Sequence, residues 1–189
     1  MIGTQIAARR HADLENIIGM FINTLVMRNY PGKEKTITGL LKEIKQRTLS
    51  AFENQEYPFE DLVEKRLGKR ELNRNPFFDV MFIWQNLGIE KIRIPGLAVK
   101  PYEEELKSSA LIDLTIYGYD STDEIIFMLE YNTALYKKET IERFIGYIRE
   151  IIAIVIAGKE TKLKGIKISH DLGKAKSGVF QDEDQEFGF

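Results

Sequence analysis

The side chains best suited to chemistry are two histidines and several acidic runs, in a chain without cysteine. His11 precedes acidic residues at positions 13 and 15, but a zinc site usually needs three or four convergent ligands, and this spacing fits no standard site. His170 stands between a serine and an aspartate, whereas the members of a catalytic triad converge from distant parts of a chain. From local spacing we therefore expect no metal site and no catalytic residue.

Two short segments resemble the end of a phosphate-binding loop. They are PGKEKT, from Pro31, and AGKET, from Ala157, and both lack the first glycine at the required spacing. The acidic runs at 103–105 and 182–184 fit a solvated surface better than paired catalytic carboxylates. We expect no cofactor to be bound by this chain.

Three polar insertions in otherwise apolar segments remain as candidates. The first is Asn23 and Thr24, the second is NQEYPFE at 54–60, and the third is RNPFFDV at 74–80. Each insertion also fits a structural role. The side chains of Asn23 and Thr24 can form hydrogen bonds with neighbouring backbone, and the second insertion can end a helix. In the third, Arg74 and Asp79 can pair and close a loop. Taken singly, the insertions leave both interpretations open.

Hydrophobic periodicity predicts the elements that must position these insertions. Helical spacing begins after Thr36, a suitable N-cap. The expected strands are 2–8, 18–28, 77–86, 111–119 and 124–132, and the expected helices are 37–52, 58–67 and 138–157. This order predicts an α/β fold, a two-layer sandwich in which helices cover a mixed sheet.

Composition narrows the class of protein. The 189 residues are 43% hydrophobic and 30% charged, with a formal net charge of −2, which gives no electrostatic drive toward nucleic acid or anionic membrane. The longest apolar run, 151–157, is far shorter than the ~20 residues of a membrane span. We expect a soluble, cytoplasmic protein with no nucleic-acid or membrane partner.

Taken together and in order, the insertions resemble the last three motifs of the condensation domains of nonribosomal peptide synthetases. IGMFINTLVMR is similar to I-G-x-F-V-N-T-L-x-x-R, with Ile22 in place of valine. NQEYPFE is similar to N-Q-D-Y-P-F-E, with Glu56 in place of aspartate. RELNRNPFFDVMF is similar to R-D-x-S-R-N-P-L-F-D-V-M-F, and departs from it at Glu71 and Asn73.

The resemblance extends over about residues 1–168. The segment IGTQIAARR is like the family's G-T-P-x-A-G-R, with Gln5 and Ala8 as departures. The family's catalytic H-H-x-x-x-D-G motif is missing from the sequence. The resemblance therefore implies the C-terminal lobe of a chloramphenicol acetyltransferase-like fold, in which two similar lobes enclose a tunnel. We expect the chain to begin in mid-domain, to be inactive alone, and to end in a linker or tail at 169–189.

Function, partners and site residues follow from the same resemblance. It implies amide-bond formation between carrier-protein-bound aminoacyl or peptidyl thioesters and an acceptor amine. The implied partners are the N-terminal lobe and peptidyl carrier proteins, whose phosphopantetheine arm tethers the substrates. The implied tunnel residues are Gly3, Thr4, Asn23 and Thr24. The implied structural residues are Arg28, which we expect to pair with a carboxylate, and Tyr57, Pro58, Arg74, Asn75, Pro76 and Asp79.

A second interpretation keeps the fold but changes the role. In it, the lobe is a non-catalytic docking module for a carrier protein or a neighbouring synthetase domain. An epimerization domain fits less well, because its counterpart of 18–28 usually departs from N-T-L-x-x-R. Strands that are apolar on both faces leave a hydrophobic patch when no partner covers them, so we also expect some self-association.

Overall fold

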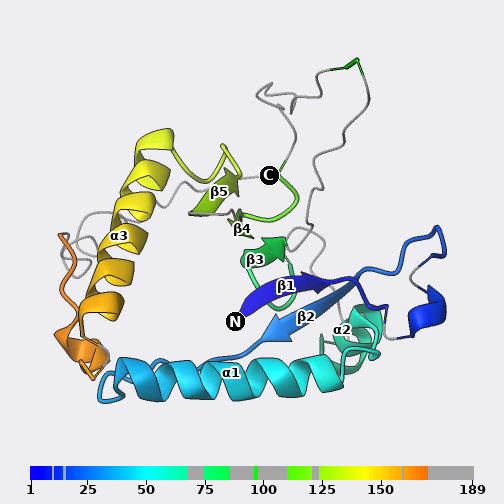
Figure 1. Ribbon diagram of the computed structural model, residues 1–189, viewed down its shortest axis with the longest axis horizontal. Coiled ribbons are helices and arrows are strands. Elements are labelled where there is room, and N and C mark those ends of the chain that lie inside the picture. Colours follow the sequence, from blue (N-terminus) through cyan, green and yellow to red (C-terminus); the bar gives the residue numbers. More distant parts are fainter. Residues whose placement is uncertain are drawn as a thin grey trace, which may run out of the picture.

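A mixed five-stranded sheet is the frame on which the rest of the chain is placed (Figure 1). The computed structural model describes residues 1–9, 11–14, 16–67, 75–85, 96–97, 110–120, 124–158 and 160–169. In these ranges the strands are β1 (Ile2–Ile6), β2 (Asn23–Met27), β3 (Val80–Gln85), β4 (Leu114–Asp120) and β5 (Ile125–Tyr131). The helices are α1 (Ile37–Glu53), α2 (Phe59–Leu67) and α3 (Lys138–Ala157), and 3₁₀ turns lie at Ala12–Leu14 and Leu163–Gly165.

The sheet has the strand order β2-β1-β3-β4-β5. β1 pairs antiparallel with β2 and parallel with β3, β3 pairs parallel with β4, and β4 pairs antiparallel with β5. Parallel neighbours need a long connection, and the one between β1 and β3 contains β2, α1 and α2. The predicted α/β fold with a mixed sheet is confirmed.

The three helices begin and end within one residue of the predicted bounds, and α2 begins at Phe59 instead of Pro58. The Thr36 side chain caps α1 by accepting a hydrogen bond of 3.1 Å from the Gly39 N–H. α3 occupies Lys138–Ala157, and the Gly158 N–H donates to the Ile154 carbonyl at 3.0 Å. Among the described helices, none combines the length and the hydropathy of a membrane span.

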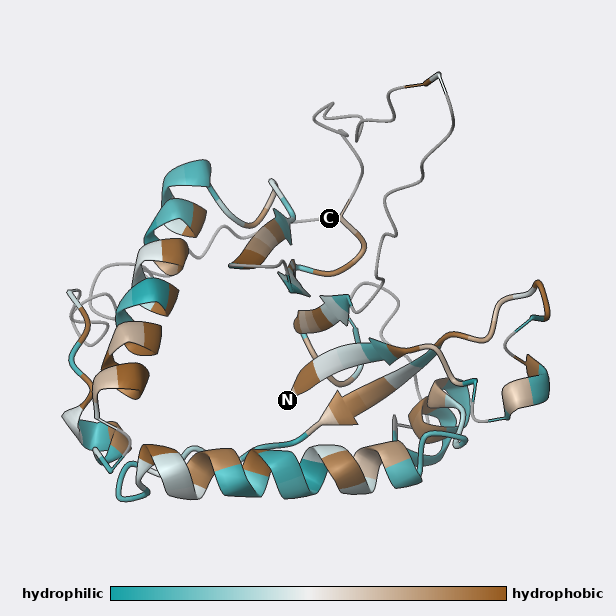
Figure 2. Cartoon of the chain, in the orientation of Figure 1, coloured by the Kyte–Doolittle hydropathy of each residue, from teal (hydrophilic) through white to brown (hydrophobic). Residues whose placement is uncertain are grey.

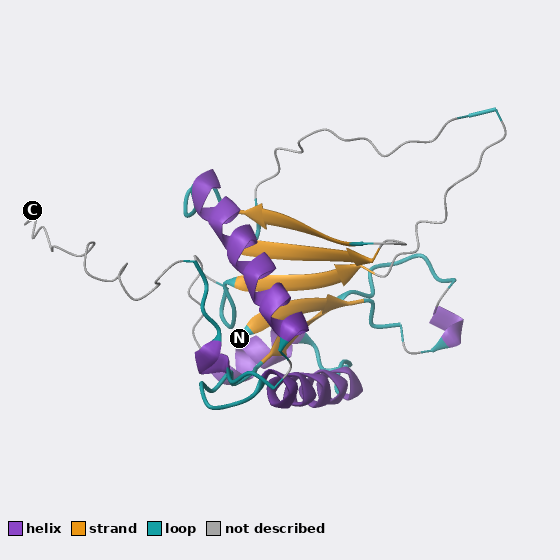
Figure 3. Ribbon diagram, turned by 60° about the vertical axis from the view of Figure 1, so that its left-hand side comes forward, coloured by secondary structure: helices purple, strands orange, loops and turns teal. Residues whose placement is uncertain are grey.

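The helices occupy two different positions around the sheet. α3 crosses one face of it (Figure 3), whereas α1 runs beside the edge strand β2 (Figure 1). The start of α1 is tied to the segment after α3, because the Ile37 N–H donates to the Thr161 carbonyl at 3.0 Å and the Leu163 N–H donates to the Lys35 carbonyl at 2.8 Å. Ile37 is buried at this junction.

The predicted strand at 18–28 is wrong in its first half. β2 begins only at Asn23, and Ile18 and Met20 lie in the preceding loop with exposed fractions of 101% and 91%. The apolar pattern of this segment therefore does not indicate burial against the described residues. The acidic run at 103–105, expected to be solvated, lies outside the described residues.

Apolar side chains are also exposed on β5, at one edge of the sheet. Ile125, Ile126, Phe127 and Met128 are consecutive and all exposed, so both faces of the strand contribute. Figure 2 shows this apolar stretch on β5 and further apolar positions along α3. The hydrophobic patch expected from the sequence is present, and self-association stays a prediction.

A close approach inside the sheet explains why position 3 is glycine. A Cβ atom at Gly3 would overlap the ring of Phe78, which is buried against this strand. Gly146, in α3, has no neighbouring atom within 4 Å of its ideal Cβ position. The same Gly→Ala substitution should therefore have opposite effects at the two positions.

We predict that Gly3→Ala lowers the free energy of unfolding by about 2 kcal/mol, because overpacking displaces a buried ring. Gly146→Ala is the matched control and should raise it by about 0.5–1 kcal/mol, the difference in helix propensity. Urea denaturation of both variants measures the two changes. A neutral Gly3→Ala would contradict the packing account.

Candidate functional site

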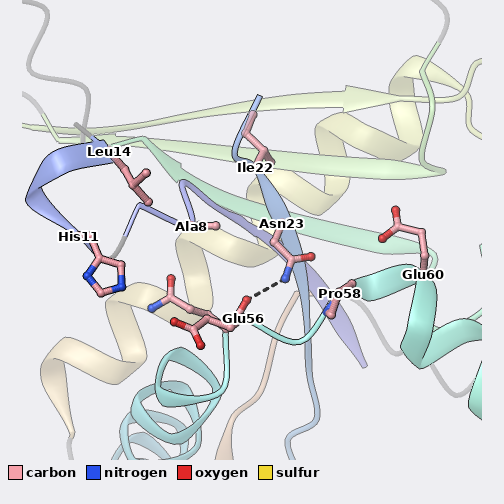
Figure 4. Close-up of a pocket in the computed structure, with 9 residues that line it drawn as sticks. Ala8, His11, Leu14, Ile22, Asn23, Glu56, Pro58 and Glu60 are labelled. Carbon is pink, nitrogen blue, oxygen red and sulfur yellow. Dashed lines mark hydrogen bonds between the residues drawn. The ribbon is translucent and has the colours of Figure 1, made fainter. Parts of the chain in front are cut away.

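A pocket of about 410 Å³ lies where the β1–β2 connection faces the turn between α1 and α2 (Figure 4). Its lining comes from two distant parts of the chain. The first part contributes Ala8, His11, Leu14, Ile22 and Asn23, and the second contributes Gln55, Glu56, Pro58 and Glu60. The pocket thus brings together the first two polar insertions found in the sequence.

The Asn23 side chain joins these two parts. Its amide nitrogen donates hydrogen bonds to the backbone carbonyls of Gln55, at 2.8 Å, and Tyr57, at 2.9 Å. Its amide oxygen accepts a hydrogen bond of 2.8 Å from the Thr24 N–H. Because a carboxamide has two N–H donors, both donors of Asn23 are used by the turn. Any effect of Asn23 on a substrate must then act through the turn that it holds.

Arg9 organises the loop on the other side of the pocket. Its guanidinium donates to the carbonyls of Leu14, Ile17 (2.8 Å) and Gly19 (3.3 Å), and it stacks 4.2 Å from the centre of the Phe21 ring. An arginine has five N–H donors in a fixed plane, which suits several carbonyls at once. The site predictions did not include Arg9, although it occupies the arginine position of the G-T-P-x-A-G-R segment.

Ala8, next to Arg9, has a left-handed backbone conformation, with φ = 48°. This conformation costs an L-residue with a Cβ about 1–2 kcal/mol, and glycine avoids the cost. The family segment G-T-P-x-A-G-R has glycine at this position, the residue that adopts this conformation most readily. The strained residue lies in the wall of the pocket.

The four predicted tunnel residues lie on two faces of the β1–β2 pair. Gly3 is opposite Val26 and Thr4 is opposite Leu25. Since paired residues share a face and faces alternate along a strand, Gly3 and Thr24 lie on one face and Thr4 and Asn23 on the other. Of these four described residues, Asn23 alone lines the pocket. Their assignment to a substrate tunnel stays a prediction.

The third motif connects to the second through aromatic rings. The Asn75 side-chain oxygen accepts hydrogen bonds from the N–H groups of Phe77, at 3.3 Å, and Phe78, at 3.4 Å. Both rings lie 6.0 Å, centre to centre, from the ring of Phe59, the first residue of α2. Pro76 lies within the turn that Asn75 closes. The motif thus places the two phenylalanines against α2.

Three other predicted structural residues make contacts outside the pocket's hydrogen bonds. The carbonyl of Pro58, directly before α2, accepts from the Leu62 N–H at 3.3 Å, and the Lys65 ammonium lies 5.1 Å from the centre of the Tyr57 ring. The Asp79 carbonyl accepts from the Leu114 N–H at 3.3 Å.

Two arginine predictions have different outcomes. Arg28 is exposed, and the described part of the chain offers it no carboxylate within ion-pair distance, so the expected partner is not found there. Arg74 lies outside the described residues, and so does its proposed pairing with Asp79.

The chemistry open to the pocket follows from its lining. His11, Glu56 and Glu60 offer hydrogen-bonding and charged groups, and Leu14, Ile22 and Pro58 offer apolar contact. Within the described ranges, no three histidine or acidic side chains are placed to share a metal ion. The pocket is suited to holding a substrate with both polar and apolar parts.

One tyrosine outside the pocket has a strongly perturbed acidity. Burial raises the pKa of Tyr117 to about 12, and the neighbouring Glu130 carboxylate adds to the effect. The Tyr117 hydroxyl donates a hydrogen bond of 2.9 Å to this carboxylate across the β4–β5 pair. A deprotonated tyrosine would lose that hydrogen bond and face a like charge.

Solved structures identify the class of fold. The chain superimposes with a TM-score of 0.78 on a four-domain nonribosomal peptide synthetase bound to AMP and glycine, at 21% identity, covering 92% of this chain and 14% of that one. The X-domain from teicoplanin biosynthesis gives a TM-score of 0.75 at 19% identity, covering 88% of this chain and 39% of that one. The chloramphenicol acetyltransferase-like fold expected from the sequence is confirmed.

The sequence identifies the family. The family model for the Condensation domain matches residues 1–176, and the chain belongs to this family. It is 44% identical over 167 residues to gramicidin S synthase 2 of Brevibacillus brevis, covering 88% of this chain and 4% of that protein. It is also 44% identical over 168 residues to tyrocidine synthase 3 of Brevibacillus parabrevis, covering 89% of this chain and 3% of that protein. The chain spans only a few per cent of the length of these relatives.

We predict that Asn23→Ala lowers the free energy of unfolding by about 1–2 kcal/mol, because two carbonyls of the turn lose their donors. Asn54→Ala is the matched control. Among the described residues, the Asn54 side-chain amide donates to one group, the Ser50 carbonyl at the end of α1, at 2.9 Å, and the change should cost at most about 0.5 kcal/mol. Chemical denaturation compares the two. Equal losses would argue against a special role for Asn23.

The raised pKa of Tyr117 predicts that the protein loses stability at alkaline pH. Because its folded pKa lies above the unfolded value of about 10, the protonated hydroxyl stabilises the fold below about pH 10, and this contribution disappears as pH rises toward about 12. Tyr117→Phe removes the titrating group, so its free energy of unfolding should fall less over this range. Identical pH dependences of the wild type and the variant would contradict the prediction.

Proposed function

We propose that the chain is the C-terminal lobe of a condensation domain, which forms amide bonds between carrier-protein-bound aminoacyl or peptidyl thioesters and an acceptor amine. Its role is to shape one wall of the tunnel in which the two tethered substrates meet. The observation that carries the proposal is the joining of the first two condensation motifs at one pocket by the Asn23 side chain. Membership of the condensation family supports the reaction class.

The reaction needs a base and precise placement of two reactants. The acceptor amine attacks the thioester carbonyl, the C–S bond breaks, the donor thiol leaves, and the amine gives up one proton. The resemblance assigns the handling of that proton to a histidine of the H-H-x-x-x-D-G motif, which this sequence lacks. We assign to this chain only the positioning of the two substrates. Positioning is a large part of such catalysis, since it makes the encounter effectively unimolecular.

The substrates reach the tunnel on phosphopantetheine arms of carrier proteins. These arms act as tethers on the substrates, and we propose no cofactor bound by this chain itself. The apolar side chains of the lining suit an alkyl segment, and its polar side chains suit an amide or amine. The hydrogen bonds of Asn23 hold together the two chain segments that line the pocket.

The proposed principal partner is an N-terminal condensation lobe. Ile18, Met20 and Ile22 project from the loop beside the pocket with exposed side chains, and β5 adds a second exposed apolar stretch. Large exposed apolar patches mark interaction surfaces in soluble proteins. We expect a cytoplasmic setting, with carrier proteins as further partners and self-association when the N-terminal lobe is missing.

A non-catalytic docking module is the second candidate. The observation that favours it is that both donors of Asn23 are used by backbone carbonyls. In this case the lobe binds a carrier protein or a neighbouring synthetase domain without taking part in the reaction. The two candidates differ in whether amide product depends on this chain.

We predict that this chain supports peptide transfer only in combination with an N-terminal lobe that carries H-H-x-x-x-D-G. Intact-mass analysis follows transfer between loaded donor and acceptor carriers, first with this chain alone and then with both lobes. An intact condensation domain is assayed in parallel as a positive control. Product from the chain alone would overturn the assignment of the base to the other lobe. If the chain binds a carrier protein but neither assay, with this chain alone or with both lobes, gives product, the docking module would be favoured.

The Asn23→Ala and Asn54→Ala variants separate positioning from stability in the same assay. At equal folded fraction, Asn23→Ala should slow transfer about tenfold, which corresponds to about 1.4 kcal/mol in the barrier. Asn54→Ala should leave the rate unchanged. A rate that simply follows the folded fraction in both variants would reduce Asn23 to a structural residue.

A further inference from the structure

A second hollow lies between α1 and α3, apart from the pocket at Asn23. It has a volume of about 620 Å³ and is lined by Thr38, Leu41, Lys42 and Lys45 of α1 and by Val155 and Ile156 of α3. The four α1 residues have the spacing of one helical face. We call this hollow the α1–α3 groove. It lies near the corner where α1 and α3 approach each other in Figure 1.

The groove has an apolar floor that the described residues leave open. Leu41 has an exposed fraction of 52% and Ile156 one of 72%. Two neighbouring residues of α3, Ile151 and Ile152, are exposed as well. Aliphatic side chains grouped in this way favour an apolar or aromatic occupant.

The rim of the groove is basic. Nearby charged groups have partners, since Lys35 pairs with Glu43 at 2.6 Å and the Thr38 hydroxyl donates to the Glu160 carboxylate at 2.9 Å. The Glu160 carboxylate keeps its negative charge, because a hydroxyl does not neutralise it. Lys42 and Lys45 have no ion-pair partner in the part of the chain that the structure describes, so the lining of the groove itself carries two positive charges. A suitable occupant therefore carries carboxylates beside apolar groups.

The C-terminal segment of this chain, residues 178–189, has this composition. Its sequence GVFQDEDQEFGF contains four carboxylates, three phenylalanines and no basic residue. The stretch 182–186 holds the four acidic residues, and phenylalanines stand at 180, 187 and 189. The segment thus complements both the rim and the floor of the groove.

The end of the described chain lies close enough for the segment to reach. The Ser169 N–H donates a hydrogen bond of 2.7 Å to the Glu150 carboxylate, which fixes Ser169 beside α3. Glu150 and Ile156 are six residues apart in the helix, or about 9 Å along its axis. Phe180 is eleven residues beyond Ser169, and this length of chain spans about 36 Å when extended. Length therefore does not limit the contact.

We propose that residues 178–189 dock in the α1–α3 groove, with acidic side chains at Lys42 and Lys45 and phenylalanine rings on Leu41 and Ile156. The groove then binds the segment that follows the lobe in the sequence. Docking covers apolar surface on α3 and fixes the direction in which the chain leaves the lobe. It is independent of the proposed catalytic role, because it uses no residue of the Asn23 pocket.

Disulfide trapping in the full chain tests the proposal, because the chain has no native cysteine. Leu41→Cys/Gln185→Cys places one thiol in the groove and one in the acidic segment, and it keeps both lysines. Gln46→Cys/Gln185→Cys is the matched control. Gln46 is exposed on the same helix but is not part of the groove lining. Oxidised glutathione is the oxidant, and intact mass under dilute conditions measures the intramolecular disulfide.

We expect the groove variant to form the disulfide at least about tenfold faster than the control, as docking raises the effective concentration of the thiols. Adding Lys42→Glu/Lys45→Glu to both cysteine variants should remove the difference between their rates. Adding Asp182→Lys/Asp184→Lys as well should restore the difference, because the two surfaces then carry exchanged charges. Equal rates in the groove and control variants would overturn the proposal, as would a rate insensitive to charge reversal. A predominantly intermolecular disulfide would make a second copy the occupant and also overturn it.

Discussion

The arrangement of this lobe depends on one carboxamide. Asn23, at the start of β2, holds the turn between α1 and α2 by two hydrogen bonds to its carbonyls. The turn sets the direction of α2, whose Phe59 contacts Phe77 and Phe78. The Phe78 ring in turn fills the space left by Gly3 in β1. Parts of the three condensation motifs thus contact one another in a single packing arrangement.

A second constraint is the amount of apolar surface that the described residues leave exposed. β5 and the loop before β2 carry apolar side chains that no described element covers. In a self-contained domain such residues would be buried, since their burial is the main driving force of folding. Their exposure agrees with the proposed second lobe, which would complete both the core and the tunnel. Under the proposed function, the site is a surface shared by two lobes, and this chain contributes positioning.

The sequence predicts the regular elements well and the irregular ones poorly. α3 could be delimited because its apolar face has a constant period and Gly158 follows it, and Thr36 is a recognisable cap. The exposure of Ile18 could not be predicted, because an apolar pattern does not say what covers it. The hydrogen bonds of Asn23 could not be predicted either. They depend on a turn 32 residues away, and such contacts exist only after the chain has folded.

The most direct test of this account is amide hydrogen exchange across residues 54–60 in the wild type and in Asn23→Ala. If Asn23 holds the turn, the variant should exchange faster in this segment while the β1–β2 ladder keeps its protection, because local opening is specific to the released element. Unchanged exchange at 54–60, or an equal increase throughout the chain, would contradict the central role of Asn23.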